Sequence, residues 1–145
     1  MIKTDLNLFK SVNIQQLPVP LHIGIVGARN RNLNRDYTLV VRTFFELVDI
    51  ILGIPHKNVI VISGGAVEGA DYFTKSFTDD FDIKYREYGP SKRFPSPLRY
   101  YLRNTLIAKH SFFLIACRSY NRRGGTEYTI KEFLKHHPND RLITV

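Results

Sequence analysis

The feature that most constrains the fold is a regular alternation of short apolar runs with longer stretches of helical periodicity. The apolar runs span residues 21–26, 58–63, 83–88, 112–117 and 142–145, and the helical stretches span residues 36–52, 66–77, 97–110 and 126–136. This order is typical of a parallel β-sheet covered by helices. The 145 residues suffice for one such domain with its own core. We therefore expect one α/β domain over residues 21–145, preceded by an N-terminal arm over residues 1–20.

Right-handed crossovers leave few ways to connect five such strands. They favour a Rossmann-like three-layer domain with a five-stranded parallel sheet of order 3-2-1-4-5. Ligands of such sheets bind outside the carboxyl ends of the strands, where the strand order reverses. That point lies between the first and fourth strands. The loops that begin at residues 27, 63 and 118 are therefore predicted to form a binding site.

The residue types in these loops suit a phosphate group. Glycine lets backbone N–H groups approach an anion closely, and the N-terminus of a following helix adds partial positive charge. Arginine offers forked donors to phosphate oxygens, and Arg29, Arg122 and Arg123 lie in the same loops. Turn geometry alone explains any single Gly-Gly pair, but the convergence of three loops favours a phosphate site. The candidate ligand-binding residues from the loops are Gly27, Ala28, Arg29, Ser63, Gly64, Gly65, Gly124, Gly125 and Thr126.

The helix expected over residues 97–110 flanks this site. Ser96-Pro97 suits a helix start, with a capping hydroxyl before a proline in the first turn. Arg99 and Arg103 are four residues apart and share a face of the helix, which is either a flank of the site or a solvated basic surface. The predicted apolar face consists of Leu98, Tyr101, Leu102 and Thr105. Neither GxGxxG nor GxxxxGK[ST] occurs, so the sequence contains no dinucleotide fingerprint and no P-loop.

The positive charge is concentrated in the second part of the chain. Residues 1–90 carry ten Lys/Arg and ten Asp/Glu, whereas residues 91–145 carry eleven Lys/Arg and three Asp/Glu, which accounts for the net charge of +8. Such a basic segment favours an anionic partner, either a phosphorylated small molecule or a nucleic acid. A generally basic surface that keeps the protein soluble is the alternative explanation.

Other classes of protein are disfavoured. The single cysteine, Cys117, ends an apolar run and is expected to be a buried hydrophobe. No Cys/His/Asp/Glu cluster has the spacing of a metal site, so we expect no metal, and nothing indicates a cofactor. The apolar runs are too short to span a bilayer, and the N-terminus lacks the pattern of a secretory signal. We therefore expect a cytoplasmic protein without a membrane partner.

Four ordered motifs resemble the SLOG superfamily of Rossmann-like nucleotide-binding proteins, which includes the LOG nucleoside-monophosphate phosphoribohydrolases and the DNA-processing protein A family. The motifs are Gly27-Ala28-Arg29; Ser63-Gly64-Gly65-Ala66 with Gly69-Ala70-Asp71; Arg103-Asn104; and Gly124-Gly125-Thr126 with Thr129-Ile130. The resemblance covers most of residues 21–145 and is greatest for the small YspA-like branch. It implies a nucleotide or nucleotide-derived ligand above the glycine loops. It also adds Asp71, Arg103, Asn104 and Thr129 to the candidate site.

One position departs from the LOG pattern. LOG enzymes carry a glutamate three residues after the threonine of their glycine-rich motif, where this chain has Thr129. Cleavage of a glycosidic bond needs a placed carboxylate. Glu127 and Asp71 are the carboxylates that remain as substitutes, and the catalytic residues are left unassigned. The resemblance therefore does not establish that the chain is an enzyme.

Three functions follow from these observations. The first is a nucleotide-binding module that acts as a sensor or sequesters its ligand. The second is a nucleotide N-glycosidase, that is, a phosphoribohydrolase. The third is a single-stranded nucleic-acid binder, favoured by the basic residues after residue 90 and by tyrosines that offer stacking surfaces. A homo-oligomer is compatible with all three.

Overall fold

The computed structural model describes residue 9, residues 12–66 and residues 68–145, and it contains one five-stranded sheet. The strands lie in the order β3-β2-β1-β4-β5 and every neighbouring pair is parallel. This confirms the predicted α/β class and the 3-2-1-4-5 topology. The elements are η1 (Ile14–Gln16), β1 (Leu21–Gly27), α1 (Asn34–Phe45), η2 (Glu46–Leu52), η3 (His56–Asn58), β2 (Val59–Ser63), α2 (Ala70–Asp80), β3 (Lys84–Glu87), α3 (Leu98–His110), β4 (Phe113–Cys117), α4 (Gly125–His136), η4 (Asn139–Arg141) and β5 (Leu142–Thr144).

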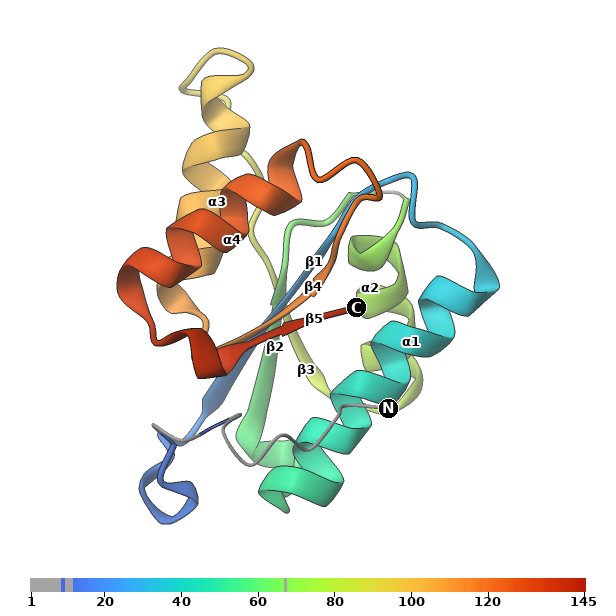
Figure 1. Cartoon of the computed structure of the whole chain (residues 1–145), viewed down its shortest axis with the longest axis vertical. Helices are drawn as coiled ribbons and strands as arrows, with labels where there is room; N and C mark the ends of the chain where they lie inside the picture. The colour runs from blue at the N-terminus through green and yellow to red at the C-terminus, as the bar shows by residue number, and fades with distance from the viewer. Residues whose placement is uncertain (1–8, 10–11, 67) are drawn as a thin grey trace.

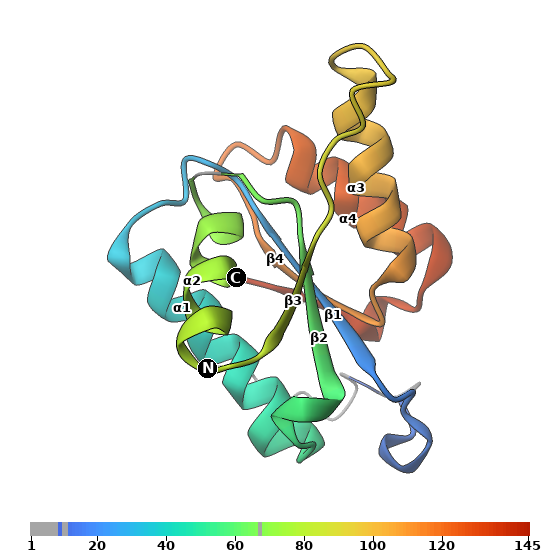
Figure 2. The ribbon, with the colours of Figure 1, turned by 180° about the vertical axis from the view of Figure 1, so that it is seen from behind.

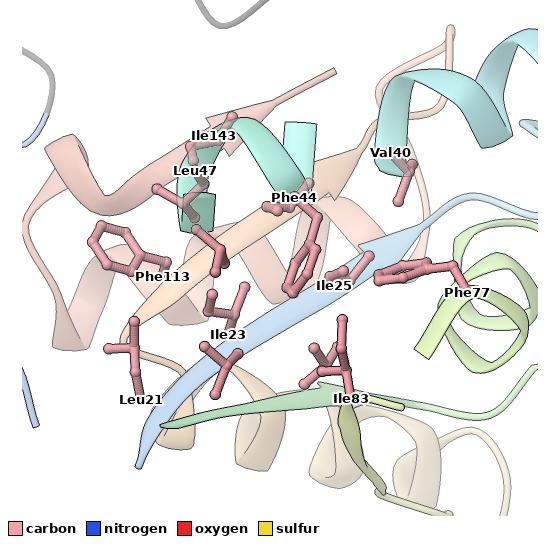
Figure 3. Close-up of a cluster of buried hydrophobic side chains, with 14 of the residues drawn as sticks. Leu21, Ile23, Ile25, Val40, Phe44, Leu47, Phe77, Ile83, Phe113 and Ile143 are labelled. Atoms are coloured by element: carbon pink, nitrogen blue, oxygen red, sulfur yellow. The ribbon is translucent and has the colours of Figure 1, made fainter. Parts of the chain in front are cut away.

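Helices cover both faces of the sheet, with α1 and α2 on one side and α3 and α4 on the other (Figures 1 and 2). The central strands are therefore buried on both faces, as their apolar runs predict. Alternate side chains of β1 face opposite sides of the sheet and belong to two different cores. Ile23 and Ile25 pack toward Phe44 and Phe77 in the first core (Figure 3), whereas Val26 belongs to the second core with α3 and α4. Cys117 is buried, and burial raises the pKa of its thiol to about 11.

Two helices differ from their predicted bounds. The predicted helix over residues 36–52 is an α-helix only as far as Phe45, and the π-helical segment η2 completes it. The predicted helix over residues 66–77 begins at Ala70, because the preceding residues form a loop that bends back over the helix start. The Asp71 carboxylate accepts hydrogen bonds from the Ser63 hydroxyl and the Ala66 N–H in this loop. Residue 67 of the predicted helix lies outside the described residues.

The orientation of α3 differs more strongly from the prediction. Pro97 occupies the N-cap position and the helix has no side-chain cap, so Ser96 does not play the predicted capping role. The buried residues of α3 are Asn104, Ile107 and Ala108. Of the predicted apolar face, Thr105 is half-buried and the three large side chains, Leu98, Tyr101 and Leu102, are exposed. The small Ala108 and the polar Asn104 face inward because α3 packs against α4 and borders the cavity described below.

Parts of the predicted N-terminal arm contact the domain. Phe9 packs edge-on against Phe113, with ring centroids 5.6 Å apart, and Val12 and Leu17 pack against the first core. Residues 1–8 and 10–11 of the arm lie outside the described residues. In the part of the chain that is described, no helix is long and apolar enough to cross a membrane.

Candidate functional site

A cavity of about 400 Å³ lies at the carboxyl edge of the sheet. Its walls come from the end of β1, the loops after β1, β2 and β4, the starts of α2 and α4, and one face of α3. The lining residues are Val26, Gly27, Ala28, Arg29, Asn30, Gly64, Ala66, Asp71, Tyr100, Arg103, Asn104, Ile107, Ser119, Asn121, Arg123, Gly124, Gly125, Thr126 and Thr129. The volume is within the range of small-ligand sites.

The structure brings the predicted site residues together with two exceptions. All of them line the cavity apart from Ser63 and Gly65. Ser63 is fully buried behind the wall, where its hydroxyl donates to Asp71. Gly65 has a φ of +74°, and a side chain there would run into Glu87, not into the cavity. Because α2 begins only at Ala70, Gly64-Gly65 is not the helix-entry turn that the sequence predicts.

Asp71 is the one carboxylate among the described residues that line the cavity. Its Oδ1 accepts from the Ser63 hydroxyl at 2.8 Å and its Oδ2 accepts from the Ala66 N–H at 3.0 Å. Burial raises the pKa of the Asp71 carboxyl, whereas these hydrogen bonds and the charge of Arg103 act in the opposite direction. Asp71 therefore fixes the shape of the loop after β2 and also lines the cavity.

Arg103 connects three elements beside Asp71. Its Nη1 donates to the carbonyl of Gly64 at 2.7 Å and to the carbonyl of Tyr88 at 3.4 Å. Its Nε donates to the side chain of Asn104 at 2.7 Å. Burial lowers the pKa of the guanidinium, but arginine keeps its charge at neutral pH. Arg103 thus holds the cavity wall and leaves positive charge beside it.

The rim of the cavity carries exposed arginines. Arg29 follows β1, and Arg123 precedes α4 in a loop closed by Ser119, whose Oγ donates to the Arg123 carbonyl at 2.9 Å. Arg122 does not line the cavity, and its guanidinium donates to the Ser119 carbonyl at 2.9 Å. Arg99 also lies outside the lining, close to the ring of Tyr100. Of the arginines that the sequence singled out, Arg29, Arg103 and Arg123 are therefore the ones at the cavity.

The N-terminus of α4 opens directly onto the cavity. Gly124 is the N-cap residue, and Gly125 and Thr126 form the first turn. Tyr128 donates the first N–H to a helical acceptor, the carbonyl of Gly124. The N–H groups of the residues between them have no acceptor within the helix, as at any helix start. This turn provides the partial positive charge that the sequence predicts at an anion site.

Glu127, the second carboxylate that could replace the LOG glutamate, is bonded outside the site. Arg118 donates to its two carboxylate oxygens at 2.9 and 2.8 Å, which lowers the pKa of Glu127. Glu127 does not line the cavity. Thr129 does, but its hydroxyl donates to the Gly125 carbonyl at 2.8 Å. The Glu127 carboxylate is therefore not presented to a ligand, and Thr129 offers only a hydroxyl that is already engaged.

Sequence reasoning missed Arg31, which positions two of the site loops. This buried side chain pairs with Asp36 at 2.7 Å and donates to the carbonyls of Arg118 and Val145 at 2.7 and 3.1 Å. It ties the loop after β1 to the loop after β4. Sequence reasoning also missed the apolar wall of the cavity. Val26 and Ile107 form this wall, and both also belong to the second core. The sequence offered one signal for Arg31, namely that an aspartate, Asp36, follows it five residues later at the start of the predicted helix.

No protein-family profile matches the sequence, and no curated protein matches it. Among solved structures, a match has a TM-score of 0.62 and 17% sequence identity. The chain is similar in fold to DNA processing protein A from Helicobacter pylori. The match covers 87% of this chain and 65% of the other, and that protein binds single-stranded DNA. This likeness confirms the Rossmann-like fold and leaves the SLOG superfamily and its YspA-like branch as a resemblance only.

Proposed function

We propose that the cavity binds a phosphorylated nucleotide and that the protein acts as a sensor or sequestering module. One observation carries the proposal: the N-terminus of α4 and three arginines converge on a cavity of small-ligand size. The helix start and the rim residues Arg29 and Arg123 suit a phosphate. The apolar wall at Val26 and Ile107 suits the less polar part of a nucleotide.

The proposal does not include N-glycosidase activity as the main function. Thr129 occupies the place of the catalytic glutamate in LOG enzymes, and Glu127 is held by Arg118 outside the cavity. Asp71 remains, but both of its oxygens already accept hydrogen bonds. The arrangement supports binding better than cleavage. Membership of the YspA-like branch of the SLOG superfamily is part of this proposal.

A thermal-shift screen tests the proposal directly. The ligands are nucleoside mono-, di- and triphosphates, ADP-ribose and cyclic nucleotides. A ligand present at about one hundred times its dissociation constant adds about 2.7 kcal/mol of stability, which raises the melting temperature by several degrees. Arg29→Ala should reduce the affinity at least about ten-fold, since one charge-assisted hydrogen bond contributes about 1.5–3 kcal/mol. Lys131→Ala, an exposed change on α4, is the control. Absence of any shift would contradict the proposal.

Single-stranded DNA is the second candidate ligand, and the structural comparison supports it more directly than the first. DNA processing protein A, which has a similar fold, binds single-stranded DNA. In addition, this chain has no acidic residue between Glu87 and Glu127. Lys92, Arg93 and Arg122 are exposed in that segment and lie outside the cavity lining. A nucleic-acid backbone would contact such residues in addition to the cavity.

Fluorescence anisotropy of a labelled oligothymidylate at several salt concentrations separates the two candidates. Binding of single-stranded DNA should weaken with a slope of about −0.7 per neutralised phosphate. Replacement of Lys92, Arg93 or Arg122 by alanine should then reduce the slope. A compact nucleotide site predicts no such reduction. Tight oligonucleotide binding without affinity for any mononucleotide would replace our first candidate by the second.

A further inference from the structure

The outward face of α3 carries an apolar stripe. Leu98, Leu102 and Leu106 are spaced by four residues, so they form a single ridge along the helix. They are 44%, 38% and 48% exposed, whereas the opposite face buries Asn104, Ile107 and Ala108. We call these three residues the leucine stripe. A helix whose outer face merely contacts water is expected to carry polar residues there.

The leucine stripe is separate from the candidate site. None of its members lines the cavity, which α3 contacts through Tyr100, Arg103, Asn104 and Ile107. Figures 1 and 2 both show the beginning of α3, with the loop before it, projecting beyond the rest of the fold. A partner on the stripe would therefore contact residues of α3 other than those that line the cavity.

The charged residues of α3 and of the loop before it are all basic. Arg99 and Lys109 lie on α3, and Lys92 and Arg93 lie in the loop before it. In the described part of the chain, none of these four pairs with a carboxylate. The stripe thus combines an aliphatic ridge with uncompensated basic side chains.

We propose that the leucine stripe is a docking surface for an acidic amphipathic helix of a partner protein. A ridge of leucines four residues apart packs into the groove of another helix. Glutamate or aspartate beside the partner's apolar face would compensate Arg99 and Lys109 and would speed association. The proposal does not depend on what the cavity binds.

The charges and the residue types disfavour other occupants. A second copy of the chain would place the same basic residues against each other, which opposes association. Single-stranded nucleic acid stacks its bases on aromatic rings, whereas the three residues of the ridge are aliphatic and the exposed rings of α3, Tyr100 and Tyr101, lie outside it. A membrane surface with anionic lipids is the remaining alternative, because basic helices with an apolar face also bind there. The experiment includes it as a separate arm.

A labelled peptide tests the proposal with the whole protein. The peptide is about 20 residues long, since shorter helices are marginal in water, with leucine on one helical face and glutamate and alanine elsewhere. A second peptide has the same composition, with the leucines dispersed around the helix. We expect the first peptide to bind at least about ten-fold more tightly than the second in fluorescence anisotropy. A purely electrostatic attraction would bind the two equally and would overturn the proposal.

Substitutions locate the binding surface. Leu102→Asp, at the centre of the stripe, should weaken peptide binding about 10- to 100-fold, the equivalent of burying one leucine side chain. Leu134→Asp is the matched control, because Leu134 is 43% exposed on α4, outside the stripe, and should bind as the unsubstituted protein does. Leu102→Ala provides a milder variant, and circular dichroism checks the fold of each. Equal binding by the Leu102 variants and the control would overturn the proposal. So would absence of peptide binding together with Leu102-dependent binding to phosphatidylserine vesicles, or Leu102-dependent self-association in sedimentation.

Discussion

The guanidinium of Arg103 donates a hydrogen bond of 2.7 Å to the carbonyl of Gly64, across residues that are 39 positions apart in the sequence. This bond joins the middle of α3 to the loop after β2. The same guanidinium lies close enough to Asp71 for the two charges to affect each other's pKa. The wall of the cavity therefore depends on an arginine whose charge also faces the proposed ligand.

We predict that Arg103→Ala destabilises the protein by about 1.5–3 kcal/mol, the range for hydrogen bonds that involve a charged group. The loss leaves the Gly64 carbonyl and the Asn104 side chain without this donor. Urea denaturation measures the change. Arg99→Ala is the matched control on the same helix, outside the cavity lining, and should stay within about 0.5 kcal/mol of the unsubstituted protein. Equal changes in the unfolding free energy for the two substitutions would show that the hydrogen bond to Gly64 adds no measurable stability.

We predict that Gly65→Ala lowers stability by about 1–2 kcal/mol, because Gly65 has a φ of +74° that an L-residue adopts only with strain. The Glu87 side chain must also move, but it is exposed and flexible. Gly89→Ala is the control. No atom lies within 4 Å of a methyl group added at Gly89, and its φ is not positive. That change should be neutral or stabilising by up to about 1 kcal/mol. Thermal unfolding distinguishes these outcomes.

The sequence was sufficient to predict the sheet order and most of the cavity lining, because buried parallel strands and glycine-rich loops leave strong local patterns. It was insufficient for α3, where Leu98 and Leu102 indicate an apolar face that the structure leaves exposed. The inward position of Asn104 depends on tertiary packing against α4 and on the cavity, and no local pattern reports either. Arg31 was missed for the same reason, since its acceptors are the distant carbonyls of Arg118 and Val145.

We predict a specific pH dependence for Asp71→Asn. Burial raises the folded-state pKa of Asp71 above its unfolded value near 3.8. The stability that the neutral acid contributes is fully present below that value and is lost as the pH rises through the folded-state pKa. Asparagine stays neutral throughout. The unfolding free energy of the variant should therefore rise relative to the unsubstituted protein as the pH increases above the unfolded value, with a slope of at most about 1.4 kcal/mol per pH unit, and level off above the folded-state pKa. A constant difference in urea denaturation would contradict the shifted pKa.

The last prediction concerns catalysis. Incubation with nucleoside monophosphates should release free base at well below about 1 per second, the low end for ordinary enzymes. The Thr129 hydroxyl donates to the Gly125 carbonyl, and Glu127 is held by Arg118. Asp71 accepts hydrogen bonds from Ser63 and Ala66. Among the described residues of the cavity lining, no carboxylate is therefore free to stabilise a developing positive charge on the ribose. Chromatography of the products measures the rate.

Asp71→Asn is the informative variant, because Asp71 is the one carboxylate among the described residues of the cavity lining. Turnover of about 1 per second that disappears in Asp71→Asn would make the protein a glycosidase with Asp71 as its acting carboxylate, and would replace the binding module that we propose.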